Sequence, residues 1–254
     1  MKKTLILLSL LAASVASAET WSSEFDFVNA SGTTVTGTND VTATITTQAG
    51  TSPTFNASGW NVATNDRYSI TFGDKALDLS EVGNSVTVTL TNVTINATQN
   101  NDYPVLFTIG DRVGSGVQSV KVLYNKANSN SQLQINGENS FSSGNHAYTG
   151  TTSIDVTTGE KYSNISLTIT KTADASYSFS LTLGDTTVTS SIKNADFTQN
   201  SDDLYLGIGG RLDNNNNKSA MTFEGMTITV TPEPTTATLS LLALAGLCAR
   251  RRRK

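Results

Sequence analysis

Residues 85–95 read SVTVTLTNVTI, and this stretch decides the fold class. Its apolar side chains Val86, Val88 and Leu90 alternate with Thr. Strict alternation predicts a β-strand with one buried face, and β-branched Thr suits the exposed face. After Leu90 the apolar residues move to odd positions, beginning at Val93. Because a slip of one residue turns the side chains to the other face, we expect a bulge or bend there.

The same alternation recurs along most of the chain. The further apolar runs are Ile165, Leu167 and Ile169; Tyr177, Phe179, Leu181 and Leu183; and Leu204, Leu206 and Ile208. A second change of phase occurs at Gly225, which separates an odd run from an even one: Met221 and Phe223, then Met226, Ile228 and Val230. Turns rich in Gly, Asn, Asp and Ser separate the runs, and no segment requires a helix of more than two turns. This pattern predicts an all-β sandwich or barrel.

The order of segments from residue 165 onward narrows the prediction. A strand, a turn at 173–175 and a second strand are followed by a tight turn at Gly184-Asp185, and the last strand ends near Val230. This order resembles the closing strands of concanavalin A-like jelly rolls, in particular their laminin-G-like branch. The resemblance implies a single jelly-roll β-sandwich in which the final strand pairs near the first. A solenoid-like β-helix is the alternative, but the sequence shows no fixed-period repeat.

Residues 1–18 have the composition of a secretory signal peptide. Lys2 and Lys3 precede an apolar run over 5–13, which is too short to span a bilayer comfortably. Small residues at Ala16 and Ala18 form a cleavage site of the A-x-A kind. We therefore expect signal peptidase to leave Glu19 as the mature N-terminus.

Residues 232–254 have three parts in order. They are the tripeptide Pro232-Glu233-Pro234, an apolar stretch over 237–249, and the cations Arg250, Arg251, Arg252, Arg253 and Lys254. As a helix the apolar stretch measures about 20 Å against a bilayer core of about 30 Å, so it is a marginal anchor. The five cations act as a membrane stop, because Lys and Arg stay on the cytoplasmic side.

This layout resembles the PEP-CTERM sorting signal of Gram-negative bacteria. The resemblance implies a transient inner-membrane anchor and recognition by a membrane-embedded exosortase, which cleaves near the tripeptide. The released protein then belongs to the cell surface, the outer envelope or the extracellular matrix. An ordinary tail anchor is the alternative.

The domain between the two ends, residues 19–231, is acidic and lacks Cys. Loss of Lys2 and Lys3 takes the net charge from −4 to −6, and loss of the five terminal cations takes it to −11 if Glu233 stays with the domain. Nucleic acid and anionic membranes are therefore not expected as partners. Disulfides are excluded because Cys248 lies in the tail.

The sequence gives little sign of catalytic chemistry, and we expect no enzyme. His146 is the single His, which excludes His/Cys metal clusters, and no nucleophile-elbow motif accompanies it. Jelly-roll glucanases carry Glu-x-Asp-x-x-Glu on a strand. Here Glu24 and Asp26 begin such a motif, but Asn29 stands where the second Glu belongs. We interpret this segment as a first strand with Phe25 and Phe27 inward and the acids outward.

Two weaker candidates for binding remain. Asp213 opens the run Asp213–Asn217, which could hold a calcium ion with help from Asp202 and Asp203, although a solvated turn is the simpler interpretation. Trp60 could stack on a sugar ring, although an aromatic of this kind is more often part of the core. No other metal or cofactor is expected.

We therefore expect an exported, non-enzymatic protein with a structural, adhesive or carbohydrate-binding role, and extracellular polysaccharide as its partner. One rival is a glycoside hydrolase-like enzyme, which two facing carboxylates about 5–9 Å apart in a cleft would favour. The other is an ice- or surface-binding protein, which a flat, exposed, regular Thr ladder would favour.

Overall fold

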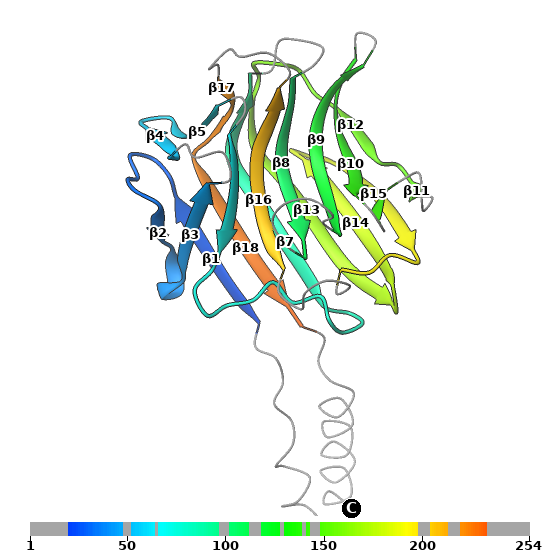
Figure 1. Cartoon of the computed structure of the whole chain (residues 1–254). Helices are drawn as coiled ribbons and strands as arrows, with labels where there is room; N and C mark the ends of the chain where they lie inside the picture. Colours follow the sequence, from blue (N-terminus) through cyan, green and yellow to red (C-terminus); the bar gives the residue numbers. More distant parts are fainter. Residues whose placement is uncertain are drawn as a thin grey trace, which may run out of the picture.

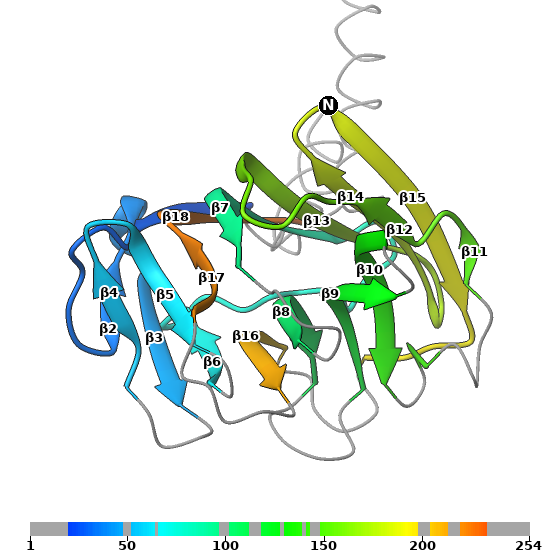
Figure 2. The same cartoon turned by 90° about the horizontal axis from the view of Figure 1, so that it is seen from above.

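The computed structural model describes residues 20–47, 52–63, 66–96, 102–111, 118–127, 130–138, 141–142, 148–197, 204–212 and 219–232. Within these ranges the protein is a sandwich of two antiparallel sheets, which Figure 2 shows as two layers. These ranges include one short helical element, the 3-10 turn η1, Thr38–Asp40. No helix in these ranges is long and apolar enough to cross a membrane. The apolar stretch 237–249 lies outside them.

The larger sheet has ten strands. In spatial order they are β11 (Thr149–Gly150), β15 (Thr186–Lys193), β14 (Ser176–Leu183), β13 (Lys161–Ala173) and β7 (Ser85–Ile95), after which β7 pairs with two strands along its other edge. One half of that edge holds β17 (Ser219–Phe223), followed by β5 (Gly59–Ala63) and β4 (Thr54–Asn56). The other half holds β18 (Gly225–Thr231), followed by β1 (Trp21–Asp26).

The smaller sheet has eight strands. Their order is β12 (Ser153–Asp155), β10 (Asn130–Glu138), β9 (Ser119–Ala127), β8 (Asp102–Gly110), β16 (Tyr205–Leu212), β6 (Arg67–Thr71), β3 (Thr42–Thr47) and β2 (Thr34–Thr36). The chain crosses between the sheets repeatedly, as in jelly rolls. The final strand β18 pairs with the first, β1, with Trp21 opposite Val230. The predicted β-sandwich and the return of the last strand to the first are confirmed.

The core lies between the sheets and follows the predicted alternation. Val86, Val88 and Leu90 of β7 are buried, and so are the apolar runs of β13, β14, β16, β17 and β18. Phe27 and Phe223 meet edge to face at 5.5 Å between ring centroids, within a larger aromatic cluster. Each such ring pair stabilises the fold by about 0.5–1.5 kcal/mol beyond the burial of area.

The two predicted changes of phase lie on one line across the larger sheet, which we call the crease. Asn92 has a φ of 52°, and Glu224 forms a bend between β17 and β18. The register is continuous across this line, since Met221 lies opposite Ile95 and Met226 opposite Leu90. No residue is inserted, so the change of phase is a bend and not a bulge.

Gly225 lies in a crowded position beside the crease. A Cβ atom there would lie 2.8 Å from Thr91 Oγ1 and 3.0 Å from the carbonyl oxygen of Phe25. Both distances are shorter than ordinary contacts, so a side chain at this position would force the Thr91 side chain and the Phe25 backbone to move.

The sheet edges are short or covered. The strands β11, β4, β12 and β2 have two, three, three and three residues. The longer edge strand β1 is covered by η1: Asn39 Nδ2 donates to the Ser22 carbonyl at 2.8 Å, and Glu24 N–H donates to Thr38 Oγ1 at 2.9 Å. Free strand edges invite pairing between molecules, and these contacts reduce that risk.

Candidate functional site: a hydroxyl face on the larger sheet

Three rows of residues cross the outer face of the larger sheet, and every member except Glu24 is Ser or Thr. The first row is Ser22, Thr229, Thr87, Thr168, Ser180 and Thr189; the second is Glu24, Thr227, Thr89, Ser166, Thr182 and Thr187; the third is Thr231, Ser85, Thr170, Ser178, Ser191 and Thr149. We call these eighteen positions the hydroxyl face. The spacing is about 4.8 Å between strands and about 6.8 Å along each strand.

The hydroxyl face follows from the alternation that builds the core. Because inward positions of β7, β13, β14 and β18 are apolar, the intervening Ser and Thr must point outward. Most of these side chains are half-buried by their neighbours rather than fully exposed. They therefore form a continuous surface layer and not isolated polar tips.

Neighbouring hydroxyl groups in the rows are hydrogen-bonded across strands. The pairs are Ser22 with Thr229 at 2.9 Å, Thr87 with Thr168 at 2.9 Å, Thr89 with Ser166 at 2.6 Å, Thr182 with Thr187 at 2.9 Å, and Thr149 with Ser191 at 2.6 Å. A hydroxyl offers one donor and two acceptor sites. A bonded pair without other partners thus has one donor and three acceptors left for a ligand, whereas in the Ser22–Thr229 pair the Ser22 hydroxyl also donates to the Ile228 carbonyl at 2.9 Å. Such a surface is neutral and matches ligands that are themselves rich in hydroxyl groups.

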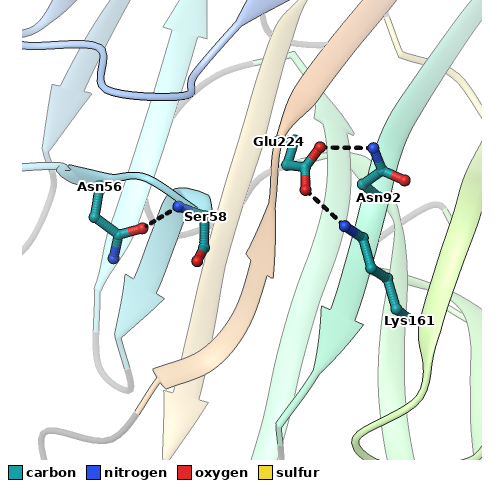
Figure 3. Close-up of polar contacts among 5 residues, drawn as sticks. All are labelled: Asn56, Ser58, Asn92, Lys161 and Glu224. Carbon is teal, nitrogen blue, oxygen red and sulfur yellow. Dashed lines mark hydrogen bonds and ion pairs between the residues drawn. The ribbon is translucent and has the colours of Figure 1, made fainter.

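A charged cluster borders the hydroxyl face at the crease (Figure 3). Glu224 accepts a hydrogen bond from Lys161 Nζ at 2.6 Å through Oε1 and from Asn92 Nδ2 at 2.6 Å through Oε2. These bonds, the one from Lys161 first, lower the pKa of Glu224 below its ordinary value. The ionised Glu224 carboxylate therefore links the start of β18 to β7 and β13. Because its ionised form is favoured, Glu224 is unsuited to act as a general acid at neutral pH.

A second polar contact in Figure 3 shapes a neighbouring hairpin. Asn56 Oδ1 accepts a hydrogen bond from the Ser58 N–H at 2.7 Å and closes the turn between β4 and β5. The adjacent Gly59 has a φ of 92°. This contact stabilises the turn itself, because an Asn side chain that hydrogen-bonds to the backbone N–H two residues later is typical of an Asx turn.

The segment that contains Glu24 and Asp26 forms the first strand, with its side chains oriented as predicted. Phe25 and Phe27 are buried, while Glu24 and Asp26 are exposed on β1. The strand ends at Asp26, and Asn29 follows in a turn with a φ of 55°. In the described residues no group of three or more His, Cys, Asp or Glu side chains is placed to hold a metal ion.

The position of Trp60 contradicts its candidate role in stacking on a sugar ring. Its side chain is 0 % exposed and packs edge to face on Phe27 and on Tyr68, each at 5.2 Å between ring centroids. A ring enclosed in this way has no face to offer a sugar. Trp60 belongs to the core because β5 is paired with β17 and the rings of Phe27 and Tyr68 cover the indole.

Several predicted sites fall outside the described residues. Pro232 is the last described residue and follows β18 directly. Beyond the described ranges lie Ala16, Ala18 and Glu19, Glu233 and Pro234, Arg250 to Lys254, and the loop candidates His146, Asp202, Asp203 and Asp213.

The outer face of the smaller sheet differs in chemistry and serves as an internal contrast. Gln134 Nε2 donates to Gln132 Oε1 at 3.2 Å, and Gln132 Nε2 donates to Asp155 Oδ1 at 2.8 Å. Exposed Arg67 lies on the same sheet. Amides and charges are thus mixed on this face, which also has a smaller Thr patch on β2, β3 and β6: Thr34, Thr44 and Thr71. The hydroxyl face has one ionisable side chain in its three rows.

Comparison with known proteins finds a weak likeness to solved β-sandwich structures. No protein-family model matches the chain, and no curated protein matches it. Alginate lyase PA1167 from Pseudomonas aeruginosa is 14 % identical with a TM-score of 0.39, over 80 % of this chain and 87 % of that chain. Lectin UEA-II in complex with galactose is 14 % identical with a TM-score of 0.48, over 83 % of this chain and 98 % of that chain.

A third structure is matched over only part of its length. The Trypanosoma rangeli sialidase is 13 % identical with a TM-score of 0.46, and the likeness covers 81 % of this chain but 30 % of the sialidase chain. These superpositions are weak, so the β-sandwich assignment rests on the strand pairings of this chain itself, and no activity is transferred from them.

Proposed function

We propose that this chain is an exported, non-enzymatic protein of the cell envelope whose hydroxyl face binds a neutral, hydroxyl-rich polysaccharide. The observation that carries the proposal is the hydroxyl face: eighteen registered positions with one charge among them. A net hydrogen bond contributes only about 0.5–1.5 kcal/mol, so one sugar would bind weakly. A polymer that touches many positions gains by repetition, because its later contacts are intramolecular.

The chemistry of the face also limits the ligand. A neutral surface offers no ion pair to an acidic polysaccharide, and Glu24 would repel one. The three rows contain no aromatic side chain, so ring stacking is not part of the proposed mode. The proposal is therefore adhesion to extended neutral chains, with a structural role in the envelope or matrix.

Ice binding is the second candidate, because the regular Ser and Thr rows are the ladder expected of such a protein. Neighbouring strands in a sheet are rotated by roughly 20° on average, so five steps across six strands accumulate roughly 100°. An ice plane is flat and fits a few strands at most, whereas a flexible polymer can follow the twist. Ice binding is therefore the second candidate, and an assay of ice-growth inhibition separates it from polysaccharide binding.

A glycosidase is less well supported. Glu24 and Asp26 are two residues apart on one strand, a Cα separation of about 6.8 Å. Both are exposed, and β1 is an edge strand. A glycosidase needs its two carboxylates on opposite sides of a bound sugar, and two side chains on an open edge do not enclose one.

Export and sorting complete the proposal. Residues 1–18 would direct export, signal peptidase would cut before Glu19, and residues 232–254 would hold the chain briefly in the inner membrane for an exosortase-type enzyme. The proposed destination is the cell surface, outer envelope or matrix. The positions of the two domain ends fit this scheme, since β1 and β18 are neighbours.

A glycan array and pull-down on insoluble neutral polysaccharides test the binding proposal. Thr168→Lys places a bulky charge in the middle of the hydroxyl face, and we expect it to abolish binding. Thr44→Lys makes the same change on the outer face of the smaller sheet, where Thr44 is exposed, and should bind as the parent does. The proposal fails if no neutral glycan is bound, or if both variants bind equally.

A further inference from the structure

Both ends of the sandwich leave it at the same pole. Strand β1 begins at Trp21, β18 ends at Thr231, and Trp21 is paired with Val230. Adjacent strands are about 4.8 Å apart, so the two exits are neighbours. Figure 1 shows the start of β1 and the end of β18 side by side at the bottom of the molecule.

The last strand is internal to the sheet and not an addition to its edge. Residues Gly225–Thr231 pair with β7 on one side, and Gly225–Val230 pair with β1 on the other. Met226, Ile228 and Val230 are each at most 2 % exposed, so the strand supplies apolar burial that the fold depends on. The sandwich therefore lacks an inner strand and three core residues until residue 231 has left the membrane.

The proposed sorting tail begins where this strand ends. Pro232 has no N–H and cannot continue the ladder. Only residues 232–236 separate β18 from the apolar stretch, a reach of at most about 17 Å when fully extended. A chain still held by its tail would thus keep the pole of the sandwich close to the bilayer.

The same pole is closed by the segment 73–84, which we call the plug loop. Leu77 and Leu79 are buried, and Trp21 Nε1 donates to the Ala76 carbonyl at 3.0 Å. Lys171 Nζ donates to the Ser80 carbonyl. The loop carries three acids, Asp74, Asp78 and Glu81, and one cation, Lys75. Its negative charge opposes close contact between the plug loop and anionic lipid.

We propose that β18 closes the sandwich while the tail still lies in the membrane, so that the sorting enzyme receives a folded domain whose plug-loop pole faces the bilayer. This inference rests on the proposed sorting function. It adds that the partner enzyme must cut within about 17 Å of the membrane surface, next to a finished sheet, and does not act on an unfolded chain.

A disulfide reporter tests the order of events. Ser22 and Thr229 are opposite each other in β1 and β18, with their hydroxyl oxygens 2.9 Å apart. Opposite residues in antiparallel strands have Cα separations that a disulfide accepts. The full chain would carry Ser22→Cys, Thr229→Cys and Cys248→Ser, exported in a Gram-negative host without the sorting enzyme. The control replaces Thr229→Cys by Thr187→Cys, which lies five strands from β1 on the same face.

We expect the membrane-held full chain to form the engineered disulfide between positions 22 and 229 quantitatively, and the control pair to form none, on non-reducing gels. The same pair of substitutions in an exported chain that stops after Pro232 should also crosslink, since all strand pairings of the described residues lie within 20–232. A crosslink in that shortened chain but not in the membrane-held one would show that closure follows cutting and would overturn the inference. No crosslink in either would refute the β1–β18 register on which it depends.

Failure of the sorting proposal itself has a different signature. If the full chain never fractionates with the membrane, the tail is not an anchor, whatever the state of the crosslink. With the membrane fraction confirmed, the crosslink alone decides whether the folded sandwich precedes cleavage.

Discussion

Replacement of Thr87 and Thr168 by Val separates the stability of the hydroxyl face from its proposed binding. Their hydroxyl oxygens are 2.9 Å apart in partly buried positions at the centre of the first row. Either single change leaves the other hydroxyl without its partner, at a cost of about 0.5–1.5 kcal/mol. The double change removes both polar groups and keeps two β-branched residues, so its net effect should be close to zero.

Because the two single costs add and the double change costs almost nothing, the expected coupling energy is about 1–3 kcal/mol, within the range of residues in contact. In a domain of this size each kcal/mol corresponds to about 2–4 °C in Tm. Equilibrium urea unfolding of parent, singles and double gives the coupling, with a constant m-value as the check on two-state behaviour. Thr87→Val with Thr189→Val is the matched control, since these positions lie three strands apart in the same row and should be additive.

The same four proteins then test binding. Loss of two hydroxyl contacts at about 1 kcal/mol each should weaken polysaccharide affinity by about tenfold or more. A double variant that is as stable as the parent and binds less tightly is the expected result. Coupling near zero would refute the paired hydroxyls, and unchanged affinity would remove this row from the binding surface.

The crease, the core and the tail each give one further prediction. Glu224→Gln should lower the free energy of unfolding at neutral pH. The difference in stability from the parent should vanish as pH falls through the lowered pKa of Glu224, because a lowered pKa means that only the ionised form stabilises the fold. Urea unfolding at about pH 7 and about pH 3 measures this difference. Trp60→Ala should lower the free energy of unfolding by about 3–5 kcal/mol. Trp60→Phe keeps a core aromatic and should bind glycans as the parent does. A specific loss of binding in a folded Trp60→Phe protein would show that Trp60 contacts the ligand. Replacement of Arg250, Arg251, Arg252 and Arg253 by Ala should weaken membrane retention, and unchanged fractionation would count against the sorting tail.

Much of the sandwich could be predicted from local alternation. The inward runs of β7, β13, β14 and β18 were identified correctly, and both changes of phase coincide with a real bend. Alternation fixes which face a side chain takes, because its period of two is a property of a single strand. The sugar-stacking hypothesis for Trp60 was wrong, since burial of one aromatic depends on strands distant in sequence.

The hydroxyl face could not be predicted in the same way. Each Thr was visible as an outward residue, but a row exists only when six strands share a register. That register is set by partners as distant in sequence as Ser22 and Thr229. Nor could the two phase changes be seen to form one crease, because nothing local states that Asn92 and Glu224 meet. The sequence feature that could have indicated the hydroxyl face was the repetition of Ser and Thr at alternate positions of several strands.

The covered edge of β1 bears on how this protein could build a larger structure. With Asn39 and Thr38 bonded to its backbone and the other edges two or three residues long, the described strands offer no long template for adding strands from a second copy. Crowded at a surface, such molecules would stay separate particles instead of growing into fibres. If the proposed polysaccharide binding holds, any network must take its connectivity from the bound polymer. Its mesh would then loosen or tighten with the supply of that polymer and not with the concentration of the protein.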